Sequence, residues 1–274
     1  MKIHIPPLKI QGIKSKLVEW IAHYVPSYDT WIEPFIGSGV VGFNLASENA
    51  IFADLNPYII QFYNDVKYRN ITSYIVKDFL EEQGGKLEIG GKDYYYEVRE
   101  RFNTTHNSLD FLFLNRAGFN GMMRFNKDGA FNVPFNHKPQ RFVKAYITKI
   151  VHQMEYIQDK IWNNNWTFQS TSFFRIINNA NKTDFIYCDP PYIGRHVDFF
   201  DSWSETDEYM LHDCLMQSHC KFMLSTWQRN EFRKNHYLDT LWTGLNIETT
   251  KHFYFVGPKE TNRHPVVEAI LKNY

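Results

Sequence analysis

Two short apolar runs, separated by a glycine-rich turn and a helical segment, stand near the start of the sequence. Residues 30–39 begin as an apolar strand and end in a turn containing Gly37 and Gly39, and residues 40–46 have the pattern of a beginning helix. The second run, residues 50–53, ends at Asp54. Strand, helix and strand in this order form a β-α-β unit, whose strands lie parallel in one sheet. The pattern therefore predicts an α/β fold.

Later segments continue the alternation of strands and helices. Apolar runs predict further strands at residues 166–169, 184–189, 221–227 and 266–271. Apolar side chains at helical spacing predict helices at residues 14–24, 57–80, 94–102, 108–115 and 141–161. Both kinds of element recur to the end of the chain, as expected for a sheet covered by helices on both faces.

The middle of the chain has a different pattern. Glycine pairs predict loops at residues 81–86 and 89–92, and residues 117–137, which contain an Asn-Lys-Asp-Gly turn, predict a β-hairpin. We therefore expect two domains. Residues 1–56 and 145–274 would form the sheet domain, and residues 57–144 would be inserted into it as a helical and hairpin domain.

Composition excludes several classes of protein. The 274 residues are 43% hydrophobic and 22% charged, which is enough for a large core and argues against general disorder. The cysteines Cys188, Cys214 and Cys220 form no Cys-x-x-Cys pair, and the histidines show no metal-ligand spacing. No signal peptide or membrane-spanning run is evident, so we expect a cytoplasmic protein without a metal, a disulfide or a membrane partner.

The net charge hides an uneven distribution. Lys and Arg number 30, as do Asp and Glu, yet residues 99–150 contain nine Lys and Arg against three acidic residues. A basic segment of this kind is typical of contact with phosphates and predicts a nucleic-acid partner. The alternative is an ordinary solvated surface.

The glycine turn and Asp54 together indicate a nucleotide-like ligand. Glycines allow a close approach of the backbone, and an acid at the end of the next strand accepts hydrogen bonds from both hydroxyls of a ribose. A Gly-x-Gly pair alone is common in tight turns. The turn has no third glycine and no P-loop lysine, which favours adenosine without a pyrophosphate over NAD or ATP.

A second motif, Asp189-Pro-Pro-Tyr192, follows the predicted strand at residues 184–189. Two prolines fix the Asp189 carboxylate and the next backbone carbonyl in one geometry, where both can accept hydrogen bonds from an exocyclic amino group. Such acceptors expose the nitrogen lone pair for attack on a methyl sulfonium, and Tyr192 offers a face on which a planar base can stack. Alternatively, the prolines only end the strand.

The chain resembles the amino-group DNA methyltransferases, and among them the Dam-type adenine-N6 methylases of the alpha group. The resemblance spans nearly the whole chain. It rests on residues 33–39, residues 53–56, the stretches 115–121 and 124–135, and residues 188–192. It implies a Rossmann-like S-adenosylmethionine-dependent methyltransferase sheet with an inserted DNA-recognition domain. It also implies S-adenosylmethionine as cofactor, with S-adenosylhomocysteine as product, and adenine N6 in double-stranded DNA as target.

The resemblance also implies the roles of individual residues. The catalytic residues would be Asp189, Pro190, Pro191 and Tyr192. The cofactor-binding residues would be Ile10, Lys14, Glu33, Pro34, Phe35, Ile36, Gly37, Ser38, Gly39, Asp54, Leu55 and Asp189. The DNA-binding residues would be Lys9, Arg116, Phe119, Asn120, Met122, Arg124, Asn132, Pro134 and Lys138. Ile10 stands where the family has a tryptophan, so we expect Phe35 to supply more of the packing around the cofactor adenine.

Base chemistry at a sheet edge requires the adenine to leave the duplex stack. Phe119 and Phe125 are candidates to fill the gap, and Arg124 is a candidate for a bidentate contact to guanine. The first expectation for the site is GATC, although Lys138 stands where GATC readers often have an aromatic residue. We expect a monomer.

Three alternatives stay open at this stage. The acceptor could be adenine in RNA or a protein glutamine amide, although the latter commonly pairs with Asn-Pro-Pro-Tyr. The chain could also be a non-catalytic DNA-binding relative. The sequence leaves open whether a cognate restriction endonuclease, not physically bound, accompanies the enzyme.

Overall fold

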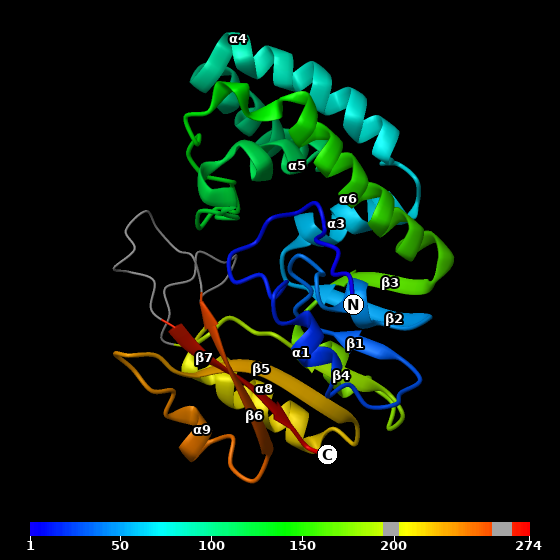
Figure 1. Ribbon diagram of the computed structural model, residues 1–274, viewed down its shortest axis with the longest axis vertical. Coiled ribbons are helices and arrows are strands. Elements are labelled where there is room, and N and C mark those ends of the chain that lie inside the picture. Colours follow the sequence, from blue (N-terminus) through cyan, green and yellow to red (C-terminus); the bar gives the residue numbers. More distant parts are fainter. Residues whose placement is uncertain (194–202, 254–264) are drawn as a thin grey trace.

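The computed structural model describes residues 1–193, 203–253 and 265–274. Within these residues, one sheet has the strand order β3-β2-β1-β4-β5-β7-β6 (Figure 1). β1 to β5 are parallel, and β7 runs antiparallel to both β5 and β6. The strands are β1 Trp31–Glu33, β2 Asn49–Asp54, β3 Asn165–Ser170, β4 Phe185–Cys188, β5 Lys221–Arg229, β6 Asn246–Phe253 and β7 Pro265–Lys272. The parallel order 3-2-1-4-5 is that of doubly wound nucleotide-binding sheets, so the prediction of a Rossmann-like α/β fold is confirmed.

Helices cover both faces of the sheet. Alternate residues along the strands point to opposite faces, and they fall into two buried clusters: Trp31, Tyr187 and Met223 lie in one, Ile32 and Ile186 in the other. The helices are α1 Val18–Ala22, α2 Gly42–Leu45, α3 Pro57–Lys67, α4 Ser73–Thr105, α5 Ser108–Ala117, α6 Lys144–Asn163, α7 Phe173–Asn178, α8 Glu205–Gln217 and α9 Tyr237–Thr240.

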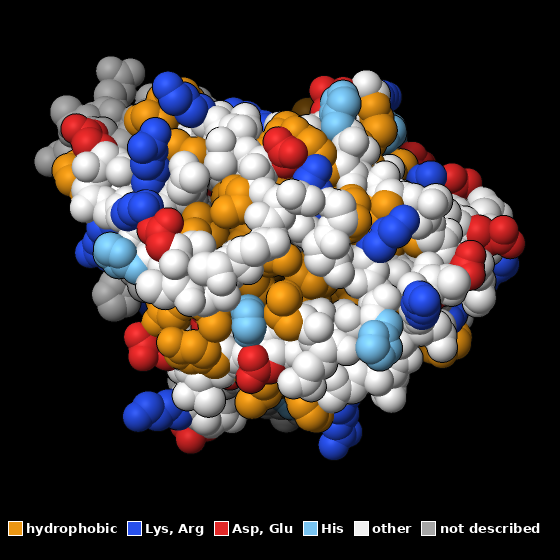
Figure 2. Space-filling view, turned by 90° about the horizontal axis from the view of Figure 1, so that it is seen from below, with side chains coloured by type: hydrophobic (Ala, Val, Ile, Leu, Met, Phe, Trp, Pro, Cys, Tyr) orange, Lys and Arg blue, Asp and Glu red, His pale blue; other side chains and the backbone are white. Residues whose placement is uncertain are grey.

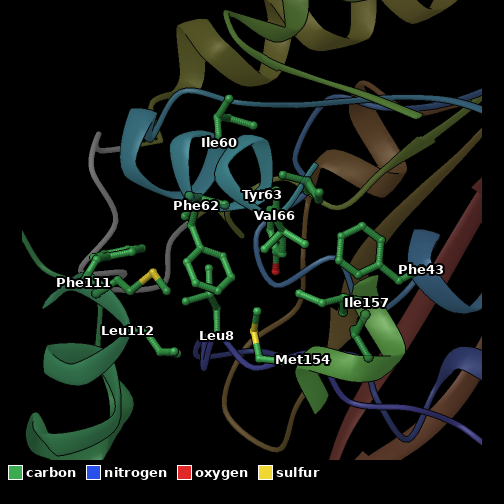
Figure 3. Close-up of a cluster of buried hydrophobic side chains, with 14 of the residues drawn as sticks. Leu8, Phe43, Ile60, Phe62, Tyr63, Val66, Phe111, Leu112, Met154 and Ile157 are labelled. Carbon is green, nitrogen blue, oxygen red and sulfur yellow. The ribbon is translucent and has the colours of Figure 1, made fainter. Parts of the chain in front are cut away.

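Helices α4, α5 and most of α6 form a separate layer beyond one end of the sheet (Figure 1). Helix α3 connects the two parts: Phe62, Tyr63 and Val66 are buried among side chains such as Leu8 and Met154 (Figure 3). The Tyr63 hydroxyl also donates to the backbone carbonyl of Ser38 at 2.7 Å. Helix α3 begins at the expected domain boundary, residue 57, and packs on the sheet. The division into two domains stays a prediction.

The loop predicted at residues 81–86 is wrong, because α4 is helical through this stretch. The interruption predicted at residues 89–92 is reduced to a kink at Gly91, which has φ 54° and ψ −127°. Gly84 permits close packing of this helix, since a Cβ there would lie 2.7 Å from Cβ of Phe142. Here glycine marks helix packing rather than a turn.

Other boundaries also differ from the predictions. The helix predicted at residues 57–80 is two helices, because Arg69 has φ 64° and Thr72 caps the start of α4. Residues 117–137 contain the short 3-10 helix Phe119–Gly121 and two isolated antiparallel bridges, Gly118 to Phe135 and Phe125 to Phe131, rather than a regular hairpin. The helix predicted at residues 14–24 is limited to α1, and strand β6 was not predicted.

Candidate active site at the carboxyl edge of the sheet

The glycine turn lies directly after β1 and is bound to the end of β2. Gly37 and Gly39 have φ values of 48° and 72°, a region that glycine adopts without strain. The backbone N–H of Gly37 donates to Oδ2 of Asp54 at 2.9 Å, and the backbone N–H of Ile36 donates to the carbonyl of Ala53 at 2.9 Å. The turn and Asp54 therefore form one structural unit.

Asp54 is a partly exposed carboxylate with a shifted proton affinity. Its Oδ1 accepts from the backbone N–H of Asn56 at 2.9 Å. Burial of the carboxyl raises the pKa of Asp54 to about 6, against the opposing effect of the two backbone hydrogen bonds. Each carboxylate oxygen accepts one backbone bond and has a second lone pair left for a ligand hydroxyl.

The remaining residues expected around the cofactor fall into three groups. Ile10 lies over the turn, since a Cβ at Gly37 would be 3.4 Å from its Cδ1. Phe35 stacks on Phe173 with ring centroids 5.5 Å apart, and Leu55 is exposed. Pro34, Ile36 and Ser38 are buried in the turn.

Glu33, expected to contact the cofactor, ends β1 directly before the turn. It is buried, and its carboxylate accepts from Nε1 of Trp31 at 3.0 Å and from the backbone N–H of Gly42. Burial raises the pKa of Glu33 well above its usual value. The arrangement ties β1 to the start of α2.

The Asp189-Pro-Pro-Tyr192 motif follows β4, and Lys14 closes onto it from the N-terminal segment. Nζ of Lys14 is 3.0 Å from Oδ1 of Asp189 and 4.7 Å from the centroid of the Tyr192 ring. Its third contact is a hydrogen bond to the backbone carbonyl of Gly12 at 3.2 Å. Lys14 is buried, so an ammonium group occupies the space between the carboxylate and the aromatic face.

Opposing effects act on the pKa of Asp189. Burial raises its pKa, the positive charge of Lys14 lowers it, and the nearby Glu268 carboxylate raises it again. Glu268, on β7, was missed by the sequence analysis. The signal was available: Glu268 is a single acid in the apolar run Val-Val-Glu-Ala-Ile-Leu at residues 266–271.

The glycine turn and the Asp189 motif lie at one edge of the sheet. They follow β1 and β4, which are hydrogen-bonded neighbours, and Asp54 ends β2 on the other side of β1. The chain order reverses between β1 and β4, and ligands of doubly wound sheets bind in the crevice at such a switch point. The topology thus brings together all three features that the sequence singled out.

The residues expected to contact DNA lie mainly in the segment 119–138. Phe119 is 46% exposed, and Asn120 and Pro134 are exposed beside it. The Phe119 backbone N–H donates to the carbonyl of Pro134 at 2.9 Å, which joins the two stretches. Met122 is half-buried and Lys138 is exposed.

Arg124 and Asn132 form a pair within this segment. Nε of Arg124 donates to Oδ1 of Asn132 at 2.8 Å, and Nη2 donates to its backbone carbonyl at 3.2 Å. One edge of the guanidinium is therefore held in place. Phe125, in contrast, stacks on Tyr58 with centroids 5.2 Å apart, which makes it a packing residue.

Lys9 and Arg116 lie where the N-terminal segment meets the helical part. The Lys9 backbone exchanges two hydrogen bonds of 2.8 Å with the amide side chain of Asn115. Arg116 is 2% exposed and donates to Tyr146 and Gln153. Its guanidinium therefore holds α5 against α6, and we leave Arg116 out of the surface expected to face DNA.

The region that includes Arg124 carries the basic excess of the sequence. At the opposite end of the molecule, in the view of Figure 2, Lys and Arg side chains are interspersed with Asp and Glu. No helix of the described residues is long and apolar enough to cross a membrane. The same residues hold no group of three or more His, Cys, Asp or Glu arranged for a metal ion.

Comparison with known proteins adds independent findings. A family model described as D12 class N6 adenine-specific DNA methyltransferase matches residues 11–255. The chain is similar to a protein named DNA adenine methylase from Vibrio cholerae, with 36% identity over 191 residues, which cover 68% of this chain and 64% of that protein.

Two further proteins of the same name have similar sequence identity to this chain. The Serratia marcescens protein is 32% identical over 228 residues, which cover 81% of this chain and 79% of that protein. The Escherichia coli K12 protein is 33% identical over 193 residues, which cover 68% and 64%. The match thus spans about 64% of the length of several of these relatives.

Solved structures show only a weak likeness. An rRNA methyltransferase, aviRa, from Streptomyces viridochromogenes has a TM-score of 0.35 and 10% identity, over 94% of this chain and 82% of that one.

Proposed function

Because the chain belongs to the family of D12 class N6 adenine-specific DNA methyltransferases, we propose that it transfers a methyl group from S-adenosylmethionine to adenine N6 in duplex DNA. The observation that carries this proposal is the placement of Asp189 and Tyr192 around a single ammonium group, across the switch point from the glycine turn. A carboxylate acceptor and an aromatic face on the two sides of one cation suit a planar base with an exocyclic amine.

The glycine turn and Asp54 fit the adenosine part of the cofactor. The ribose hydroxyls would donate to Asp54, and Gly37 and Gly39 would allow the backbone to approach the ligand closely. Ile10 and Phe35 are the apolar side chains beside this space. When bound, S-adenosylmethionine supplies a methyl group on a positively charged sulfur.

Asp189 and the backbone carbonyl of Pro190 would hold the two hydrogens of the adenine amine. This keeps the nitrogen lone pair out of the ring system and directs it toward the methyl group. The Lys14 ammonium now forms an ion pair with the same carboxylate, with Nζ 3.0 Å from Oδ1. The target amine must therefore replace the Lys14 ammonium at Asp189, which exchanges one donor for another.

Double-stranded DNA is the proposed partner, and the target base would turn out of the duplex at a cost of a few kcal/mol, roughly the unstacking energy. Support comes from the exposed aromatic ring of Phe119 and from the basic residues between 99 and 150. Arg124, already oriented by Asn132, is the proposed guanine contact, with GATC the first sequence to test.

Purified protein with methyl-labelled S-adenosylmethionine tests the proposal. We expect label in duplex DNA, recovered as N6-methyladenine, and none in structured RNA or in protein glutamine. Asp189→Ala serves as the matched inactive control. Label confined to RNA or to protein would reject DNA as the acceptor, and DNA binding without any transfer would identify a non-catalytic relative.

A further inference from the structure

A buried acid on the far strand of the sheet contacts the proposed catalytic motif. Glu268 lies on β7, paired with Trp227 of β5 and Thr250 of β6, and is 1% exposed. Its Oε2 accepts a hydrogen bond of 2.6 Å from the hydroxyl of Tyr192. The two residues are 76 positions apart in the chain, so this bond joins the motif to the antiparallel part of the sheet.

Glu268 is buried in apolar surroundings, where an acidic side chain costs free energy. Nearby on the strand, Val266, Ala269 and Ile270 are buried and apolar, and Val267 is half-buried. Among the described residues, Oε1 of Glu268 has no hydrogen-bond partner, so the Tyr192 hydroxyl supplies the hydrogen bond that Glu268 makes here. Burial of an acid costs free energy unless its interactions compensate for it, and Glu268 also interacts electrostatically with His252 and with Asp189 of the motif. These interactions place Glu268 within the site rather than in a purely structural position.

We propose that Glu268 is a positioning residue, which orients the Tyr192 ring for the target base through the hydroxyl of Tyr192. This inference rests on the proposed function. A tyrosine side chain rotates about two bonds. A short hydrogen bond at its hydroxyl fixes the first rotation and thus the position of the ring, and the preference of the phenol O–H for the ring plane restrains the second. The ring face then stays turned toward the space beside Asp189, where the Lys14 ammonium now lies 4.7 Å from the ring centroid.

The bond has a chemical consequence as well as a geometric one. A carboxylate that accepts from the phenol increases the electron density of the ring, which strengthens its attraction for positive charge on its face. As the N6–C bond forms and the sulfur takes the electron pair of the broken S–C bond, N6 becomes positively charged until one of its protons leaves to water. Glu268 would stabilise that charge through Tyr192.

The test combines Glu268→Leu, Glu268→Gln and Tyr192→Phe in a double-mutant cycle. The readouts are the single-turnover methyl-transfer rate and the dissociation constant of S-adenosylmethionine. Glu268→Leu should lower the rate at least tenfold with the dissociation constant unchanged. Glu268→Gln, which can still accept from the phenol but carries no charge, should recover part of the rate. In the Tyr192→Phe background the same Leu substitution should cost less than twofold.

Glu248→Leu is the matched control. Glu248 is also a strand glutamate that accepts from a tyrosine, Tyr24 at 3.4 Å, but it lies on β6 beside Lys272. Its substitution should leave the rate unchanged. An undiminished rate in Glu268→Leu, or an equal loss with and without the Tyr192 hydroxyl, would overturn the proposal.

Fluorine NMR of protein labelled with 3-fluorotyrosine separates this proposal from the proposed function. The resonance that disappears in Tyr192→Phe belongs to Tyr192, and it should shift in Glu268→Leu but not in Glu248→Leu. No shift would overturn the assignment of Glu268 even if the protein methylates DNA. A shift in a protein that methylates nothing would support the contact and reject the proposed reaction instead.

Discussion

Asp189 is held between burial, which favours its neutral form, and the Lys14 ammonium, which favours its charge. Removal of the carboxylate would leave the carbonyl of Pro190 as the remaining acceptor for the amine. Asp54 and the glycine turn lie on the other side of the switch point and do not contact Asp189 through any described hydrogen bond. Substitution of Asp189 should therefore lower the methyl-transfer rate, whereas substitution of Asp54 should lower the affinity for the cofactor.

Asp189→Ala should lower methyl transfer by roughly 100- to 10,000-fold, the range of a lost acid–base or hydrogen-bonding group in catalysis. Affinity for S-adenosylmethionine should change little. Rapid-quench kinetics and calorimetric titration give the two quantities. Turnover near that of the unmodified protein would show that Asp189 does not activate the amine.

Asp54 predicts a pH dependence of cofactor binding. Its pKa is raised to about 6, so it is ionised above that pH and could then accept from both hydroxyls of the proposed ribose. Affinity for S-adenosylmethionine should fall as the pH falls through 6. The ligand-free protein shows the opposite sign: because the folded pKa exceeds the unfolded value, the contribution of Asp54 to stability decreases as the pH rises through 6.

Calorimetric titration between pH 5 and 8 (roughly one pKa unit or more on either side of the midpoint) checks the binding side. Asp54→Asn keeps the size of the side chain and should bind more weakly and without the step near pH 6, since each lost charge-assisted bond is worth about 1.5–3 kcal/mol. A step that persists in Asp54→Asn belongs to another group.

At the scale of elements, helix α4 offers two adjacent glycines with opposite surroundings. A Cβ at Gly84 would lie 2.7 Å from Cβ of Phe142, whereas a Cβ at Gly85 meets nothing within 4 Å. Gly85→Ala should raise the free energy of unfolding by about 0.5–1 kcal/mol through helix propensity. Gly84→Ala should lower it by about 1–3 kcal/mol through overpacking. Urea denaturation followed by circular dichroism compares the two, and equal effects would contradict the packing described here.

We expect Arg124, in segment 119–138, to contact a base, and Lys144, on α6, to contact a phosphate. Arg124→Ala should cost about 1–3 kcal/mol on the cognate duplex and relax discrimination at one base pair. Lys144→Ala, at the exposed start of α6, should weaken all duplexes alike and reduce the salt slope by about one. Binding to duplexes with single substitutions at two salt concentrations distinguishes them. A uniform loss in Arg124→Ala would make it a backbone contact.

The strands around the site could be predicted from the sequence because each is a short apolar run with a diagnostic end: the glycine turn, Asp54 or Asp189. The loop prediction at residues 81–86 was wrong because glycine has two uses, and only the contact of Gly84 with Phe142 distinguishes them. The same limit applies to Glu268 and Arg116. Their partners, Tyr192 and Tyr146, are far away in sequence, so only tertiary packing reveals what they touch.

As a whole, the described part of the molecule is a seven-stranded sheet with an added helical layer beyond one end (Figure 1). The N-terminal segment connects the two: Lys9 is bound to Asn115 at the end of α5, and Lys14 reaches Asp189. The contact to the expected DNA-facing part and the contact to the proposed catalytic carboxylate are only five positions apart in the chain. The N-terminal segment thus joins the part expected to face DNA to the motif at which we propose the chemistry.

Sequencing of N6-methyladenine in DNA from a host that expresses this chain tests the central claim most directly. A host without its own adenine methylation, expressing either the unmodified protein or Asp189→Ala, provides the comparison. The account predicts N6-methyladenine at one short sequence throughout the genome with the unmodified protein, and none with Asp189→Ala. Unmethylated DNA from cells that contain the folded protein, or the same methylation with Asp189→Ala, would contradict it.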